Sequence, residues 1–135
     1  MKRRAMYVPA MLCLLVATTA IAHPGTAPRV ATQTENVTMN GEVVDPQCYF
    51  VHDSRGIAHA ACAAKCAKGG QGMSFLDDAT GVVYPLIART HGVSQNEGLL
   101  QHLGKPIQVK GVVFRKGPSF VLLIQSVVAS TAKTK

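Results

Sequence analysis

The chain has 135 residues, a length that fits one domain and argues against a multidomain architecture. Charged residues make up 16% of the sequence and hydrophobic residues 47%, which excludes a chain that is disordered throughout. The formal net charge is +7, and such a basic balance would suit a nucleic-acid partner if it persisted in the folded protein.

The first 22 residues have the pattern of a secretory signal peptide. Three basic residues at 2–4 precede an uncharged, mostly apolar stretch of 18 residues at 5–22, which ends in small residues suited to cleavage after Ala22. The alternative is a membrane anchor, but the stretch contains Pro9 and is at the short limit for a spanning helix. We therefore predict a periplasmic or secreted protein with no membrane span after cleavage.

Cleavage would change both the charge and the cysteine count. The processed chain would have 113 residues and a charge of +4, because the three basic residues at 2–4 leave with the signal peptide. This modest charge, together with export, argues against a nucleic-acid partner. Cys13 would also leave, so that three cysteines remain. In an oxidising compartment, an odd number of cysteines leaves at least one thiol without a disulfide partner in the same chain.

The processed chain divides into a flexible lead-in at 23–35, one folded domain at 36–129 and a polar tail at 130–135. Alternation, turn residues and caps predict the following elements in order: a strand at 37–43, an Ala-rich helix at 57–68 ended by Gly69 and Gly70, strands at 73–76 and 82–87 joined by a turn at 77–81, a capped helix at 94–103, and strands at 107–114 and 120–128 joined by a turn at 115–118.

This order of elements predicts a mostly β protein with two short helices. Three strands, a helix and two further strands are the sequence of an OB-like small five-stranded barrel, here with a helical Cys/His insert after the first strand. Gly41 and Gly111 lie inside predicted strands, where such barrels need bends. Pro85 predicts an edge or a bulge for its strand. The alternative fold is an α+β open sheet with both helices on one face.

One group of residues carries recognisable chemistry. His59, Cys62 and Cys66 have the spacing i, i+3 and i+7, which places them within about 60° of one another on a helix. Cys48 precedes that helix, and the 13 intervening residues can return it to the same face. Three sulfurs and an imidazole suit tetrahedral Zn(II) or thiolate-bound Cu(I), with His52 as an alternative or additional ligand.

A disulfide is the main alternative to a metal site. Cys48 paired with Cys62 or Cys66 would close a loop of about 15 to 20 residues and contribute about 3 kcal/mol, leaving one free thiol. The two states can alternate, because oxidation removes the metal ligands. The spacing does not choose between the metals, although the softness of the ligands favours copper.

Two segments together resemble a group of small exported bacterial proteins. The first is the G-x-V-x-D-x-x-C-[YF] pattern that runs from Gly41 to Tyr49, and the second is the H-x-x-C-A-x-x-C-x-x-G-G pattern that runs from His59 to Gly70. This resemblance implies an OB-like C-terminal part and treats Cys48, His59, Cys62 and Cys66 as one set. It names neither an activity nor a ligand.

From these observations the sequence predicts an exported binding module that holds Cu(I) or Zn(II) through Cys48, His59, Cys62 and Cys66. The alternative is a disulfide-stabilised interaction domain of the envelope or periplasm that binds no metal. The expected partners are a metal donor or acceptor, or an envelope protein. No nucleophile or general base has a recognisable partner, so an enzyme is not expected.

Overall fold

The computed structural model describes residues 30–129, so the predicted signal peptide and polar tail and most of the lead-in lie outside the described residues. Five antiparallel strands form one sheet in the order β3-β2-β1-β4-β5. The strands are β1 (Gln33–Val44), β2 (Ser74–Asp77), β3 (Val83–Pro85), β4 (Ile107–Lys116) and β5 (Ser119–Ala129). The helical segments are α1 (Pro46–His52), η1 (Ile57–His59), α2 (Ala60–Lys68) and η2 (Leu100–His102).

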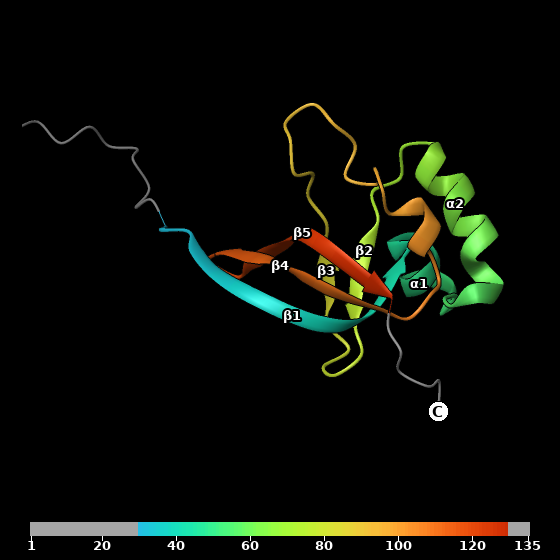
Figure 1. Cartoon of the computed structure of the whole chain (residues 1–135), viewed down its shortest axis with the longest axis horizontal. Coiled ribbons are helices and arrows are strands. Elements are labelled where there is room, and N and C mark those ends of the chain that lie inside the picture. Colours follow the sequence, from blue (N-terminus) through green and yellow to red (C-terminus); the bar gives the residue numbers. More distant parts are fainter. Residues whose placement is uncertain (1–29, 130–135) are drawn as a thin grey trace, which may run out of the picture.

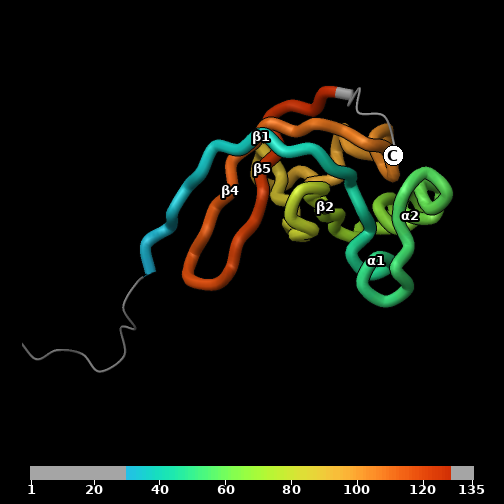
Figure 2. The backbone as a smooth tube through the Cα atoms, turned by 90° about the horizontal axis from the view of Figure 1, so that it is seen from below, coloured from blue at the N-terminus to red at the C-terminus, as the bar shows by residue number. Residues whose placement is uncertain are grey.

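Strand β1 connects the two halves of the sheet. It pairs with β4 along residues 33–41 and with β2 along residues 41–44. It begins at Gln33, three residues before the expected start of the folded unit. In Figures 1 and 2, α1 and α2 gather at the end of the sheet where β1 finishes, away from the turn between β4 and β5.

The two glycines predicted to permit bends lie where backbones approach closely. A Cβ atom on Gly41 would collide with the carbonyl oxygen of Leu76 on β2, and one on Gly111 would collide with that of Leu123 on β5. The register between β4 and β5 shifts at Lys110 and Gly111, which marks a β-bulge there.

The structure confirms a mostly β fold with a helical insert after the first strand, but the sheet is not closed. A single parallel bridge joins Leu86, just after β3, to Leu122 on β5, supported by a hydrogen bond of 3.0 Å from the N–H of Ile87 to the carbonyl of Leu122. No continuous ladder joins β3 to β5 among the described residues. A closed barrel therefore stays a prediction.

The predicted helix at 57–68 forms as η1 followed by α2, and Gly70 supplies the left-handed end with φ +97°. Helix α1 was not predicted; it begins at Pro46, between the predicted strand at 37–43 and the predicted helix at 57–68. The predicted helix at 94–103 was wrong, because that segment consists of turns followed by the short η2.

Tertiary hydrogen bonds explain the missing helix. The amide side chain of Asn96 is buried, and its Oδ1 accepts the N–H of Met73 at 3.2 Å. Its Nδ2 donates to the carbonyls of Ala67 and Gln71 at 3.1 and 2.7 Å. Asn96 thus joins the end of α2 to the start of β2. Gly98, at φ +75°, also interrupts helical geometry.

The hydrophobic core lies between the sheet and α2. Ala63 and Ala67 form the buried face of α2 and belong to this core. The rest of the buried core is made of Val43, Met73, Phe75, Tyr84, Leu86, Leu99, Leu103, Ile107, Val109, Val113, Leu122 and Ile124. None of the helices within residues 30–129 is long and apolar enough to cross a membrane.

Replacing Gly41 with alanine tests the crossing of β1 from β4 to β2. We expect Gly41→Ala to lower the free energy of unfolding by about 3 kcal/mol, because the new methyl group has to displace backbone. Urea unfolding measures the change, and Thr38→Ala, at an exposed position of the same strand, serves as the control. Equal stability of the two variants would contradict the close approach at Gly41.

Candidate metal centre

Helix α1 brings Cys48 into the site, and local sequence explains its start. Asp45 is the N-cap residue, and its Oδ1 accepts the backbone N–H groups of Gln47 and Cys48 at 2.9 and 3.2 Å. Pro46 occupies the first turn, where its fixed φ suits a helix and its missing N–H is not needed. The chain therefore turns from strand to helix within one residue.

The end of α1 is equally well defined. Asp53 adopts the left-handed conformation with φ 51°, and its N–H donates to the carbonyl of Tyr49 at 3.0 Å. The N–H of Ser54 donates to the carbonyl of Cys48 at 3.2 Å. These bonds close α1 after two turns and reverse the chain toward α2.

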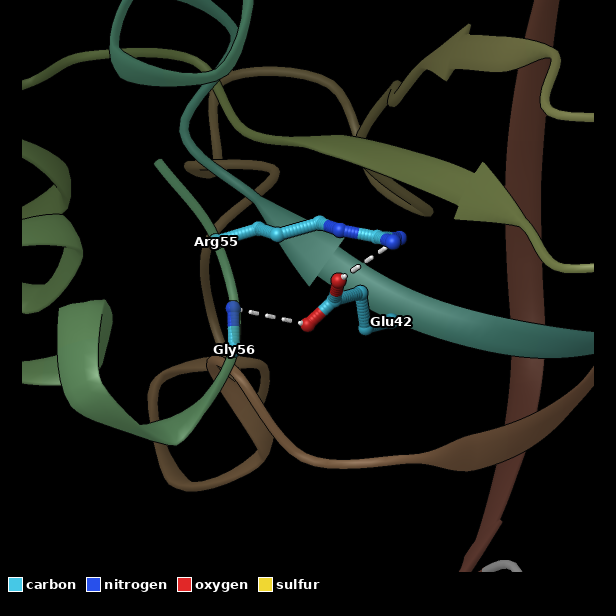
Figure 3. A network of polar contacts seen from close by, with 3 residues as sticks. All are labelled: Glu42, Arg55 and Gly56. Atoms are coloured by element: carbon cyan, nitrogen blue, oxygen red, sulfur yellow. Dashed lines mark hydrogen bonds and ion pairs between the residues drawn. The ribbon is translucent and has the colours of Figure 1, made fainter. Parts of the chain in front are cut away.

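A carboxylate from β1 holds the connection between the two helices (Figure 3). Glu42 is 8% exposed; its Oε2 accepts the N–H of Gly56 at 3.1 Å, and its Oε1 lies 3.5 Å from the guanidinium of Arg55. Burial raises the pKa of Glu42, and this effect exceeds the lowering by Arg55 and by the N–H of Gly56. The backbone contact fixes where η1 and α2 begin relative to the sheet.

Helix α2 supplies two sulfurs one helical turn apart. Because Ala63 and Ala67 face the core, the neighbouring Cys62 and Cys66 lie toward the boundary of the packed face. Cys66 is partly buried and packs against the core, whereas Cys62 is exposed. The site is therefore anchored at one sulfur and open to solvent at another.

The structure brings the three cysteines together from two separate helices. The Sγ atoms of Cys48, Cys62 and Cys66 all lie within 4.8 Å of one another, and all three are free thiols. Tetrahedral zinc with Zn–S bonds of about 2.3 Å holds its sulfurs about 3.8 Å apart. Side-chain rotations alone can supply the small contraction that a metal ion requires.

The predicted fourth ligand is not in this group. The cluster of ligand atoms within residues 30–129 contains no histidine nitrogen. His59 lies in η1, where residues advance by about 120° rather than the 100° of an α-helix, so the phase of α2 does not extend to it. Its Nε2 is buried without a hydrogen-bond partner, and His59 and Asp45 line the same small cavity. His52 is exposed at the end of α1.

Asp45 acts on the sulfurs as well as on the helix. Its side chain is almost fully buried, at 2% exposure, and no donor lies in hydrogen-bonding geometry with its Oδ2. Burial raises the pKa of Asp45, but the nearby thiols of Cys66 and Cys48 and the backbone N–H groups lower it further, so the net shift is downward. The carboxylate therefore stays ionised at neutral pH.

The pKa values of two thiols shift upward, opposite to that of Asp45. Loss of hydration raises the pKa of Cys48 to about 11, with further contributions from the Asp45 carboxylate and the two other sulfurs. The pKa of Cys66 also lies above its ordinary value, first because of Asp45 and then because of burial. Without a cation, the cluster is therefore protonated at Cys48 and Cys66 at neutral pH, and a bound metal ion has to displace those protons.

The sequence interpretation missed two carboxylates of this site. An Asp immediately before Pro is a signal for the start of a helix, and it would have identified Asp45 as the cap of α1. No local signal identifies Glu42, because its partners at 55 and 56 become neighbours only through the fold.

The chain was compared with known proteins at three levels. No protein-family model, no curated protein and no solved structure matches it. The geometry and chemistry of the site are therefore the basis for its proposed function.

Alkylation of the reduced, metal-free protein tests the electrostatics of the cluster. At pH 8 we expect iodoacetamide to modify exposed Cys62 first and Cys48 last, because a raised pKa leaves less reactive thiolate. The rate at Cys48 should keep rising as the pH approaches about 11. Peptide mapping by mass spectrometry measures each rate. Equal rates at Cys48 and Cys62 would contradict the raised pKa of Cys48.

Two substitutions of Glu42 test its contact with the connection between the helices. We expect Glu42→Ala to cost about 1–3 kcal/mol in urea unfolding, because the N–H of Gly56 loses its acceptor. Glu42→Gln keeps an acceptor oxygen and should retain most of the stability. Glu35→Ala is the control, since its ion pair with Arg115 is exposed and 4.0 Å long. If all three variants lose the same stability, the contact has no particular structural role.

Proposed function

We propose that this protein is an exported module that binds one thiophilic metal ion, Cu(I) or Zn(II), through Cys48, Cys62 and Cys66. The supporting observation is the convergence of three sulfurs within 4.8 Å from two separate helices. Thiolates are the protein ligands that these two ions share, and three of them provide most of a coordination shell.

The exposure of the site favours metal exchange over permanent structural support. Structural zinc sites have four protein ligands, whereas the group of ligand atoms in residues 30–129 has three. Cys62 is exposed, so an incoming ligand can reach the ion. We therefore propose storage or delivery, with a metal donor or acceptor as the partner, and with His59 as a fourth ligand only if its ring moves out of its cavity.

Two further parts of the proposal concern location and fold. The basic start and the apolar stretch at 5–22 support export to the periplasm or beyond, with cleavage after Ala22. The strand order and the Leu86–Leu122 bridge support an OB-like barrel that is nearly closed between β3 and β5.

The same proximity supports a second candidate, a disulfide-stabilised interaction domain. The sulfur of Cys48 lies near both sulfurs of α2, so an oxidant can join it to either one after a small rotation. This state excludes the proposed metal, because two of the three ligands are consumed.

Metal content and thiol count of the exported protein together test the proposal. Protein purified without oxygen should retain about one equivalent of copper or zinc after dialysis and contain three reactive thiols once the metal is removed. We expect Cys48→Ser, Cys62→Ser and Cys66→Ser each to weaken binding at least tenfold, as loss of one ligand implies.

Ala61→Ser is the matched control, since it places a hydroxyl beside Cys62 at an exposed position of α2 and keeps every sulfur. His59→Ala reports whether the imidazole contributes to binding. Protein that retains no metal and shows one reactive thiol would overturn the proposal in favour of the disulfide.

A further inference from the structure

A buried carboxylate without a cationic partner lies beside the sulfur cluster. The ion pairs within residues 30–129 join Arg55 to Glu42 and Arg115 to Glu35, and Asp45 takes part in neither. Burying an ionised carboxylate without a counter-charge is costly, and such groups normally pair with a cation. The Oδ1 of Asp45 accepts the backbone N–H of Cys48 at 3.2 Å, which places the carboxylate next to a residue of the cluster, and its buried Oδ2 has no hydrogen-bond partner.

Asp45 is close to the cluster but is not one of its ligands. Carboxylate oxygens can bind metal ions, but those of Asp45 do not belong to the group of sulfurs that lie within 4.8 Å of one another. Its Oδ1 is also held by the two N–H groups at the start of α1. Its effect on a bound ion therefore acts through space, from a position with 2% exposure where solvent screens poorly.

We propose that Asp45 sets the charge preference of the cluster and favours divalent over monovalent thiophilic ions. This inference rests on the proposed metal binding by the three cysteines. Zn(II) and Cu(I) would each displace the same thiol protons, so the proton cost cancels in the ratio of their affinities. What remains from Asp45 is its attraction for the extra positive charge of the divalent ion.

The size of this effect follows from the Coulomb interaction. One unit of charge at about 5 Å, with an effective dielectric constant of about 20, changes an affinity by roughly a hundredfold, and stronger screening reduces this to about tenfold. Thiolate ligands alone bind Cu(I) more tightly than Zn(II). Asp45 reduces this difference in affinity by favouring Zn(II).

The test compares two neutral substitutions at opposite ends of α1. Asp45→Asn removes the buried charge, and asparagine caps helices as well as aspartate does. Asp53→Asn removes an exposed charge at the C-cap, where asparagine tolerates the left-handed conformation. Circular dichroism checks the fold of each, and Asp45→Ser, whose hydroxyl also caps helices, replaces Asp45→Asn if the latter does not fold.

Affinities for Zn(II) and for Cu(I) are measured separately on reduced protein, by competition with chromophoric chelators. We expect the ratio of the Zn(II) to the Cu(I) association constant to fall at least tenfold in Asp45→Asn and to change less than twofold in Asp53→Asn. An unchanged ratio in Asp45→Asn, or an equal fall in both variants, would overturn the inference while leaving metal binding intact. Absence of binding by the unsubstituted protein would overturn the proposed function as well.

Discussion

The candidate site depends on the junction at which β1 becomes α1. A single buried side chain, Asp45, ends the strand and starts the helix by accepting two backbone N–H groups. Because the strand ends here, Cys48 lies on α1, where its sulfur is close to the two sulfurs of α2. Because the same carboxylate also lies beside the thiols of Cys48 and Cys66, the backbone geometry and the electrostatics of the cluster have one origin.

The rest of the fold keeps the two helices in place around this junction. Glu42 holds the connection at Gly56, the small residues Ala63 and Ala67 seat α2 on the core, and Asn96 ties the end of α2 to β2. Each restraint is made by groups of the protein other than the three sulfurs. The conformational entropy of gathering three sulfurs is therefore lost during folding, so that an ion bound there, as we propose, would meet a partly formed site.

The chemistry of the cluster balances opposing effects. Burial and the carboxylate raise the pKa of the Cys48 and Cys66 thiols, which keeps both protonated, so a cation that binds there has to displace their protons. Three sulfurs in one place offset this by offering a soft ion a nearly complete shell. Exposed Cys62 then leaves one side of that shell within reach of solvent, an arrangement suited to exchange.

The sequence by itself determined the features that depend on near neighbours. The Ala-rich segment ending at two glycines specified a helix with Cys62 and Cys66 one turn apart. Gly41 and Gly111 indicated bends inside their strands, and the structure adds that a neighbouring backbone approaches closely at both positions. Only the tertiary structure decided how those pieces meet. His59, in the 3₁₀ turn, lines a small cavity and is not one of the ligand atoms that lie within 4.8 Å of one another. The side chain of Asn96 bridges the end of α2 and the start of β2, where the local pattern had indicated a helix. Helix periodicity and capping act over a few residues, whereas the partners of Glu42, Asn96 and Cys48 lie more than ten residues away and become neighbours only when the sheet assembles.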